Sequence, residues 1–432
     1  MNGLTRRHFI QGTGAALTAA FVPSQAFGAN EKINFACIGV GGRGGAHVGP
    51  AASHNLVALC DVDKNRLGKQ ARKHAKAKAF QDYRRLFDSM AKQIDAVFVA
   101  TPDHHHFHAS RMALQLGKHV YCEKPLTHSV WEARTLAEEA KKAKVATQMG
   151  NQGLSSEGTR LLAEFLAAGA IGDVREVHIW TDRPQGWWPQ GCTRPKDTPP
   201  VPGNLDWNTW LGPAPERPYH SCYLPFKWRG WWDFGTGALG DIGCHAMAPI
   251  FFALDFAYPT AVELVDEEGM TKESGPQWAI IRYDIPARGK RPPYKLFWYD
   301  GKKKPPRPEE LEKSRKIPNG GALLIGDKGK MFAGGTPRII PESKMKEFKR
   351  PEQSLPRIPK GSHHEDFFIA CKGGRPACSN FSFAGPVTET VLAGNLALRL
   401  KRRIELDLPN LKAKNVPEAD TLIKREYRKG WT

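Results

Sequence analysis

Short apolar runs alternate with amphipathic stretches from residue 33 to about residue 150. Such runs are typical of strands buried on both faces of a parallel sheet, and the stretches between them show the three-to-four-residue repeat of helices. The alternation predicts β-α-β units in a doubly wound parallel sheet. The predicted strands are residues 33–38, 56–61, 95–100, 118–122 and 145–149, and the predicted helices are residues 44–53, 64–75, 82–91, 106–117 and 129–143.

The pattern changes after a further helix predicted over residues 156–168. Strand-like segments are then separated by turns and proline-rich loops, which favours a large, open, mostly antiparallel sheet in a second α/β domain. A chain of 432 residues is long enough for two domains that share a cleft. The strand-like segments are residues 174–180, 261–265, 278–284, 294–299, 322–325 and 330–332, and helical patterns return at 363–372 and 386–401.

A glycine-rich turn follows the first predicted strand. Gly39, Gly41 and Gly44 have G-x-G-x-x-G spacing, and Asp61 ends the next strand 22 residues after Gly39. Such glycines permit a tight turn, a close approach to a pyrophosphate and close helix packing, while the acid accepts hydrogen bonds from ribose hydroxyls. We therefore expect a Rossmann domain over residues 31–152 that binds NAD. NADP is less favoured, because Asp61 would repel its 2′-phosphate.

Residues 1–28 have the pattern of an export signal. Arg6 and Arg7 precede Phe9 and an apolar run too short to cross a bilayer, and the small residues at 26–28 suit cleavage. Paired arginines indicate the twin-arginine route. We therefore expect a periplasmic protein that acquires its cofactor before export. No later segment has the length and hydrophobicity of a membrane span.

Charge does not point to nucleic acid. The chain has 63 Lys and Arg against 44 Asp and Glu, a net charge of +19 that becomes +17 without the leader. Much of the excess lies in the proline- and lysine-rich residues 288–316 and 343–360, which match no nucleic-acid motif. We interpret these segments as solvated loops and expect no nucleic-acid partner.

The cysteines and histidines do not predict a metal site. Three cysteines occupy apolar strand positions, where free cysteine is common, and no C-x-x-C pair occurs. Four others fall in predicted loops, so one disulfide remains open; they are Cys192, Cys222, Cys371 and Cys378. His104, His105, His106 and His108 begin a predicted helix, where consecutive side chains point in different directions.

Two further motifs carry candidate acid–base residues. Lys124 follows the predicted strand 118–122 within Glu123-Lys124-Pro125, where it would reach the nicotinamide end of a cofactor. A partly desolvated lysine can exchange a proton with a substrate hydroxyl. Asp241 and His245 follow a glycine-rich segment at a spacing of four, which places both on one helical face. There Asp241 could orient or charge-balance the His245 imidazole, while the imidazole transfers a proton.

These motifs together resemble the Gfo/Idh/MocA family, which includes glucose–fructose oxidoreductase and inositol dehydrogenase. The resemblance covers the chain after the leader and rests on the glycine turn, Asp61, residues 101–106, Glu123-Lys124-Pro125 and the Asp241/His245 pair. It implies a Rossmann domain over residues 31–152 and a C-terminal α/β domain over residues 153–432 whose open sheet forms a dimer or tetramer. Asp103 departs from the asparagine that the family often has there.

The resemblance also implies the roles of individual residues. Lys124 and His245 are the expected acid–base residues, and Asp241 is their partner. The expected cofactor-binding residues are Gly39, Gly41, Gly42, Arg43, Gly44, Asp61, Thr101, Pro102, His106, Glu123, Lys124, Asn151 and Gln152. The tryptophans and prolines of segment 182–232 also lead us to expect that it lines the cleft, and the residues expected to contact substrate are Arg229, Trp231, Trp232 and Asp233. For each tryptophan, core packing or a subunit interface is an equal alternative.

The implied activity is NAD-dependent oxidation or reduction at a hydroxyl or keto group of a sugar, cyclitol or glycoside. Because no NAD pool exists outside the cytoplasm, we expect a tightly held cofactor. Two alternatives remain open. One is a glycosidase that oxidises C3 transiently, eliminates across the acidified C2 position and then regenerates NAD. The other is a non-enzymatic sugar sensor that retains bound cofactor.

Overall fold

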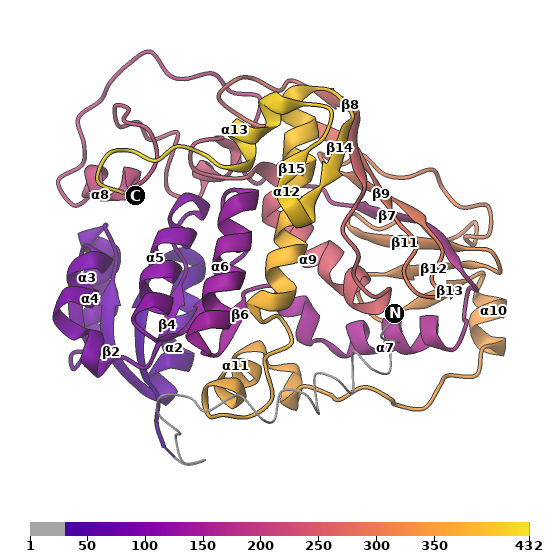
Figure 1. The fold of residues 1–432 in the computed structure, drawn as a ribbon, viewed down its shortest axis with the longest axis horizontal. Helices are drawn as coiled ribbons and strands as arrows, with labels where there is room; N and C mark the ends of the chain where they lie inside the picture. The colour runs from indigo at the N-terminus through magenta and orange to yellow at the C-terminus, as the bar shows by residue number, and fades with distance from the viewer. Residues whose placement is uncertain (1–30, 432) are drawn as a thin grey trace.

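The computed structural model describes residues 31–431, which form two domains side by side (Figure 1). The predicted export signal at residues 1–28 lies outside the described residues. The expected fold class is confirmed, since a parallel sheet is followed by a second, mostly antiparallel sheet. No helix among residues 31–431 is long and apolar enough to cross a membrane.

The first domain contains a six-stranded parallel sheet in the order β3-β2-β1-β4-β5-β6. Neighbouring residues of β1 face opposite layers: Phe35 and Cys37 pack with α2, α3 and α11, while Ala36 and Ile38 pack with α4, α5 and α6. The strands are β1 (Asn34–Ile38), β2 (Asn55–Cys60), β3 (Lys78–Phe80), β4 (Ala96–Val99), β5 (His119–Cys122) and β6 (Thr147–Met149). The helices are α2 (Gly45–Ser53), α3 (Lys64–Lys73), α4 (Tyr83–Met90), α5 (Asp103–Gln115), α6 (Val130–Ala143) and α11 (His363–Cys371).

The sequence missed β3, the edge strand of this sheet. Its three residues are exposed or half-buried, so they carry no apolar run. Strand pairing with β2 holds them instead.

The second domain contains a nine-stranded sheet in the order β13-β12-β11-β7-β10-β9-β8-β14-β15. All its pairs are antiparallel except β7 with β10. The strands are β7 (Val174–Trp180), β8 (Ala261–Glu268), β9 (Trp278–Ile285), β10 (Tyr294–Tyr299), β11 (Gly321–Gly326), β12 (Lys330–Ala333), β13 (Arg338–Ile340), β14 (Ile404–Asp407) and β15 (Lys412–Ala413).

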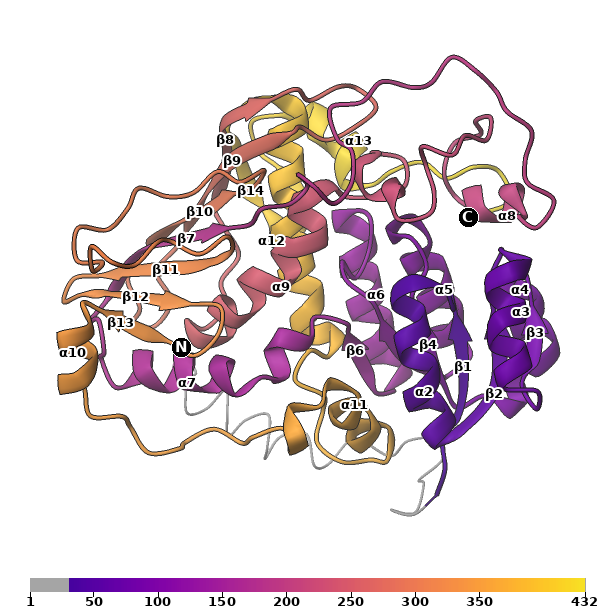
Figure 2. The same cartoon turned by 180° about the vertical axis from the view of Figure 1, so that it is seen from behind.

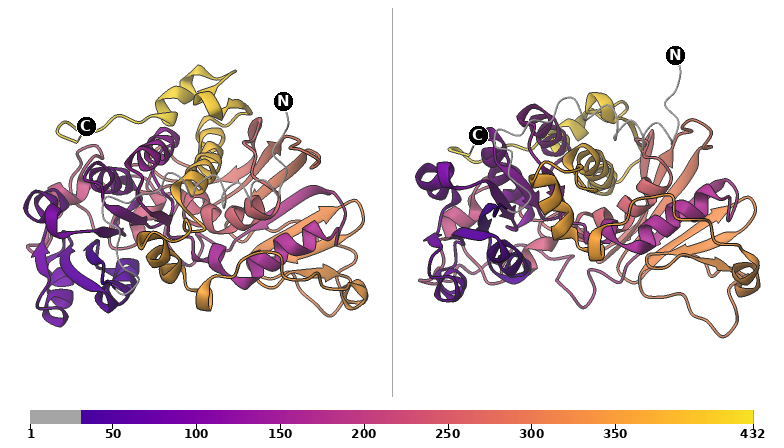
Figure 3. Two further views of the ribbon diagram at one scale, coloured as in Figure 1. Left: turned by 60° about the horizontal axis from the view of Figure 1, so that its bottom comes forward. Right: turned by 90° about the horizontal axis from the view of Figure 1, so that it is seen from below.

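Three helices lie against this sheet: α7 (Glu157–Ala167), α9 (Gly237–Ala253) and α12 (Phe381–Leu400) (Figures 2 and 3). Helix α12 begins at Phe381 rather than at Pro386, because the Asn380 side chain caps it by accepting from the Ser382 backbone N–H at 3.0 Å. The helix packs against α6 and α9, so one core runs through both domains.

A long segment, residues 182–235, leaves β7 and returns at the start of α9; we call it the aromatic insertion. It contains one short helix, α8 (Trp207–Leu211), and its own cluster of buried rings. Two other short helices, α10 (Glu342–Glu347) and α13 (Asp420–Ile423), were not predicted either. All eight cysteines are free.

Candidate active site

A cavity of about 550 Å³ lies between the carboxyl ends of the Rossmann strands and the aromatic insertion. This is the position at which open α/β sheets bind ligands. The predicted site residues that line it are Gly39, Gly41, Gly42, Arg43, Asp61, Thr101, Pro102, His106, Glu123, Lys124, Gln152, Arg229 and His245. Residues distant in sequence are thus gathered at one rim, as the strand-end pattern predicted.

The glycine turn has the geometry of a dinucleotide cradle. Gly39 has φ +79°, and a Cβ there would lie 2.6 Å from the Ala100 carbonyl oxygen. A Cβ on Gly44 would collide with the Gly39 carbonyl, although Gly44 itself does not line the cavity. Any side chain at either position would therefore push the turn away from the strands that a cofactor must approach.

Asp61 closes this turn. Its Oδ2 accepts from the backbone N–H groups of Val40 at 3.0 Å and Gly41 at 3.1 Å, and its Oδ1 accepts from Asp63 N–H at 3.0 Å. Burial raises the pKa of this carboxyl, while the backbone donors oppose that shift. Because Asp61 lines the cavity beside the turn, it is placed to accept from a ribose hydroxyl as well.

Lys124 and Arg229 share one carboxylate oxygen. Lys124 Nζ lies 2.6 Å from Asp241 Oδ1, and Arg229 Nε lies 2.9 Å from the same atom. Burial opposes ionisation of Asp241, but the two cations outweigh it and lower its pKa to about 2. Asp241 is therefore ionised, and it holds the lysine at the cavity without lining the cavity itself.

His245 lines the cavity from α9, one turn beyond Asp241. Burial and the nearby Lys124 charge lower its pKa to about 4, so the imidazole is neutral near pH 7 and can accept a proton. The Asp241 carboxylate bonds to Lys124 and Arg229. Of the two expected roles toward His245, orienting and charge-balancing, the structure favours the second, because the Asp241 charge raises the imidazole pKa against the burial that lowers it.

Asp103 is another acidic group that lines the cavity, and the sequence showed it only as a departure from a family pattern. Its side chain is buried, and Oδ2 accepts from the Thr236 N–H at 3.1 Å and hydroxyl at 2.7 Å. Within residues 31–431 its Oδ1 has no hydrogen-bond partner. Burial raises the pKa of Asp103 to about 7, despite the nearby Lys124 charge. Asp103 thus joins α5 to the start of α9.

Glu123 lies at the centre of a second charged group. Its Oε1 accepts from Arg43 Nε at 2.9 Å and from Gln152 Nε2 at 3.2 Å, and it lies 3.0 Å from His47 Nε2. Burial raises its pKa, but the His47 and Arg43 contacts outweigh that and hold the pKa well below the usual range. His47 was missed because it lies within α2 with no local motif. Arg43 and Gln152 are thus held beside Lys124.

The remaining loop residues have supporting positions. His106 contacts the carbonyl oxygens of Pro125 at 2.7 Å and Thr101 at 2.9 Å, which ties the two cofactor loops together. Asn151 does not line the cavity. It lies buried behind it, where its amide donates to the Cys244 carbonyl at 3.3 Å.

Three of the four predicted substrate-contact residues do not line the cavity. Trp231 and Trp232 are buried away from the cavity, and the Trp231 indole donates to the Cys222 carbonyl at 3.1 Å. Asp233 pairs with Arg217, a side chain buried in the aromatic insertion. The aromatic side chains of the insertion that do line the cavity are Trp210, Phe226 and Trp228, and Tyr83 lines it from the Rossmann domain. Sequence could not separate these from core tryptophans, because the insertion has no regular periodicity.

The aromatic insertion is joined to the cofactor side of the cavity. The backbone N–H of Lys64 donates to Asn204 at 2.8 Å, and that of Asp206 donates to Val62 at 3.0 Å. Asn204 Nδ2 also donates to Asp63 Oδ1 at 2.8 Å. We call residues 202–212 the strap, because these bonds close it over the loop that follows Asp61.

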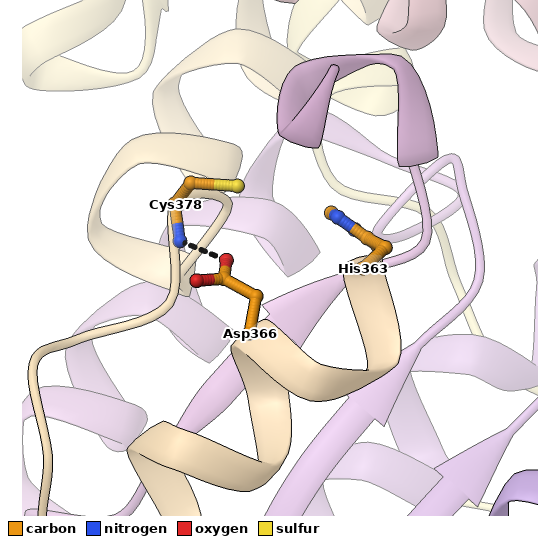
Figure 4. Close-up of side chains that lie close together, drawn as sticks. All are labelled: His363, Asp366 and Cys378. Atoms are coloured by element: carbon orange, nitrogen blue, oxygen red, sulfur yellow. Dashed lines mark hydrogen bonds between the residues drawn. The ribbon is translucent and has the colours of Figure 1, made fainter. Parts of the chain in front are cut away.

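A Cys–His–Asp group lies behind β6 and consists of His363, Asp366 and Cys378 (Figure 4). The His363 ring contacts Ser155 Oγ at 2.5 Å and the Met149 carbonyl at 2.8 Å. Asp366 accepts from the Cys378 N–H at 2.7 Å and pairs with Arg375 at 2.6 Å. Both imidazole nitrogens and both carboxylate oxygens therefore have protein partners, and the group fixes the loop after β6.

Two family models match the chain. Residues 33–151 match one described as an oxidoreductase family, NAD-binding Rossmann fold, and residues 181–288 match its C-terminal alpha/beta domain. Together they cover more than half of the chain. The predicted NAD-binding domain and second α/β domain are thereby confirmed.

Individual relatives match over shorter segments. The chain is 33% identical to an inositol 2-dehydrogenase of Rubrobacter xylanophilus over 152 residues, which is 34% of this chain and 42% of the relative. It is 26% identical to a 1,5-anhydro-D-fructose reductase of Ensifer adhaerens over 184 residues, 42% of this chain and 44% of the relative. The chain thus spans less than half the length of these curated relatives.

The fold matches solved structures over most of its length. The WlbA dehydrogenase of Bordetella pertussis, in complex with NADH and UDP-GlcNAcA, aligns with a TM-score of 0.59. The alignment covers 87% of this chain and 99% of that structure at 18% identity. At this identity the likeness establishes the shared fold.

Proposed function

The chain belongs to the Gfo/Idh/MocA oxidoreductase family, and we propose that it oxidises or reduces a CH–OH or keto group of a sugar, cyclitol or glycoside. One observation supports this proposal most strongly. Lys124, held by Asp241, and the neutral His245 line the same cavity as the glycine turn that is expected to bind NAD. The relatives named as inositol dehydrogenase and anhydrofructose reductase support a polyhydroxylated substrate.

His245 and Lys124 have separate roles in the proposed oxidation. The neutral imidazole of His245 accepts the proton of the substrate hydroxyl. The Lys124 ammonium, held by Asp241, donates a hydrogen bond to the same oxygen and stabilises the charge that develops there. Bound NAD supplies the acceptor for the hydride that leaves the adjacent carbon. In the reverse direction His245 returns the proton to the ketone oxygen, which the Lys124 ammonium polarises.

Cofactor retention is part of the proposal. The strap bonds to the loop after Asp61, and both line the cavity. Arg428 near the C-terminus holds the strap in turn, through Nη1 to Asn208 Oδ1 at 2.8 Å and Nε to the Gly212 carbonyl at 2.9 Å. These contacts support a cofactor that stays bound between turnovers.

Absorbance at 340 nm tests the proposal directly. Purified protein, with and without added NAD, is mixed with a panel of aldoses, cyclitols and glycosides, and product sugars are identified by mass spectrometry. Reduction of the nicotinamide together with a keto product is the expected result. Net hydrolysis of a glycoside without added NAD would instead identify the glycosidase, and sugar binding with no redox change or hydrolysis would identify the sensor.

We also propose export by the twin-arginine route to the periplasm, on the sequence of residues 1–28. Fractionation of cells expressing the full chain tests it, with Arg6→Lys/Arg7→Lys as the matched variant. Cytoplasmic retention of the variant and periplasmic recovery of the wild type are expected. Recovery of the wild type in the cytoplasm would contradict export.

The proposed homo-oligomer uses the open face of the second sheet. Along β9 every second residue is buried, while the alternate positions, including Ile280, are only half-buried. Light scattering of the purified protein should give a dimer or tetramer mass. A monomer mass at micromolar concentration would reject this part of the proposal.

A further inference from the structure

The cavity has an aromatic side chain at its mouth that the proposed chemistry does not use. Phe226 lines the cavity and is 43% exposed. Lys124 is deeper, since its side-chain exposure is 11%, and Arg229, which binds the same Asp241 carboxylate, is 14% exposed. Phe226 therefore lies on the outward path from the reacting groups to solvent.

The backbone of Phe226 is strained. Its φ of +69° and ψ of −37° place it at the centre of a three-residue turn, which the Lys227 N–H closes by donating to the Pro225 carbonyl at 2.8 Å. A bulky residue with positive φ is uncommon, and such strain is concentrated at functional sites. Core packing does not account for the strained backbone, because a phenyl ring that is only half-buried gains little stabilisation from burial.

The Phe226 ring is fixed relative to the reacting groups. The Arg229 guanidinium lies 4.1 Å from its centroid and 4.3 Å from that of Trp228, and Arg229 Nη1 donates to the Phe226 carbonyl at 3.1 Å. The Trp188 ring meets it edge-on at 5.9 Å. Arg229 also bonds to Asp241, so a chain of contacts runs from the exposed ring to Lys124.

We propose that Phe226 is a stacking platform for the second sugar ring of a glycoside or oligosaccharide, while the terminal ring reacts at Lys124 and His245. The apolar C–H face of a pyranose packs well on an aromatic ring, and the rigid phenyl loses little conformational freedom on binding. This inference rests on the proposed function and narrows its substrate class to saccharides larger than one ring.

Calorimetric titration tests the platform without requiring turnover. The probes are methyl glucosides, galactosides and xylosides, each paired with the 1,4-linked disaccharide that has the same non-reducing sugar. For at least one pair the wild type should bind the disaccharide about tenfold more tightly than the monosaccharide. Phe226→Ala should reduce that ratio to near one, and Phe226→Trp should restore it.

Val201 supplies the matched control, since it is also 43% exposed within the aromatic insertion and does not line the cavity. Val201→Ala should keep the wild-type ratio. A ratio near one in the wild type for every pair, or an unchanged ratio in Phe226→Ala, would overturn the platform. Failure of the nicotinamide to respond to any sugar, with the ratio intact, would reject the redox function and leave the platform standing.

A second measurement separates the platform from a packing role. Glycine adopts positive φ without strain, whereas alanine does not. Phe226→Gly should therefore unfold at a temperature equal to or above that of Phe226→Ala, while both lose the disaccharide preference. A Phe226→Gly protein that is the less stable of the two would contradict the strained-platform assignment.

Discussion

Lys124 Nζ lies 2.6 Å from Asp241 Oδ1, although the residues are 117 positions apart and belong to different domains. Both side chains are nearly buried, with exposures of 11% and 8%, so each charge depends on the other rather than on water. The proposed acid–base group therefore forms only when the two domains are packed together.

Lys124→Met should lower the rate of nicotinamide reduction by about 10²- to 10³-fold, the usual contribution of one donor that stabilises charge in the transition state. The change removes the ammonium that polarises the substrate oxygen and leaves the glycine turn intact. Single-turnover absorbance at 340 nm measures it. Lys92→Met, at an exposed lysine in the 3-10 turn before β4, is the control and should keep the full rate. A Lys124→Met protein with wild-type turnover would remove Lys124 from the mechanism.

Asp241→Asn should lower the free energy of unfolding by about 3 kcal/mol, because it leaves Lys124 and Arg229 as buried cations without a counter-charge. Chemical denaturation with and without cofactor measures the loss. Asp88→Asn removes an exposed carboxylate whose nearest cation, Arg85, is 3.9 Å away, and should change stability by less than about 0.5 kcal/mol. Equal stability of the two variants would show that the buried pair is not needed.

Asp61→Ala should weaken NAD binding by about ten- to a hundredfold. It removes an acceptor for the ribose hydroxyls and for the N–H groups of Val40 and Gly41, each charge-assisted bond being worth about 1.5–3 kcal/mol. Titration of cofactor-free protein measures the change, and mass spectrometry of the ligand released from the wild type should identify NAD. Release of NADP would contradict the role assigned to Asp61.

Asp103→Asn should stabilise the protein increasingly as pH rises. The folded pKa of Asp103, about 7, lies above the unfolded value, so its contribution to stability is complete below about pH 4 and is lost as pH rises through 7. The difference of about three pK units between the folded and unfolded states corresponds to at most about 4 kcal/mol of folding stability. Thermal unfolding from pH 5 to pH 8 should therefore show a rising difference between variant and wild type. A difference independent of pH would contradict the raised pKa.

Asp300→Asn provides the comparison for that experiment. Burial also raises the pKa of Asp300 to about 7, but this residue does not line the cavity. The stability of Asp300→Asn relative to the wild type should also increase with pH. The variant should be less stable overall than Asp103→Asn, because Asp300 Oδ2 accepts from the Trp298 indole at 3.0 Å. It should leave turnover unchanged.

Arg428→Ala should accelerate cofactor release. It removes the hydrogen bonds that fix the strap at Asn208 and Gly212, each worth about 1–3 kcal/mol, so an increase of roughly tenfold or more is expected. Displacement of bound NAD by a fluorescent analogue measures the rate. Arg402→Ala, at an exposed arginine, is the control. An unchanged release rate in Arg428→Ala would show that the strap does not retain the cofactor.

Local pattern predicted most of the first domain and the positions of Lys124 and His245 at the cavity. Gly39, Gly44 and Asp61 belong to one local turn, whose geometry determines their positions. Lys124 lies two residues after the end of the buried strand β5. The same reasoning failed where contacts are long-range and irregular. Trp231 and Phe226 are five residues apart in one segment, yet only tertiary packing buries the first and exposes the second.

The role of Asp241 shows the same limit. Its spacing to His245 was correct, but its strongest partner comes from another domain and its second partner, Arg229, from an aperiodic segment. Asp103 was visible in the sequence, while its bonds to Thr236 depend on the docking of α5 against α9.

The strap has a consequence for kinetics. If the cofactor is retained as proposed, a dinucleotide beneath the strap would leave only after the bonds between Asn204 and residues 63–64 open, so each protein molecule would keep its own oxidised or reduced cofactor. NAD would then act as a prosthetic group rather than a co-substrate. Each oxidation would have to be followed by a reduction in the same cavity before the next oxidation could begin. Double-reciprocal plots of steady-state rate against the substrate that is oxidised, at several concentrations of the substrate that is reduced, should accordingly give parallel lines. This is the pattern of two substrates that react alternately at one site.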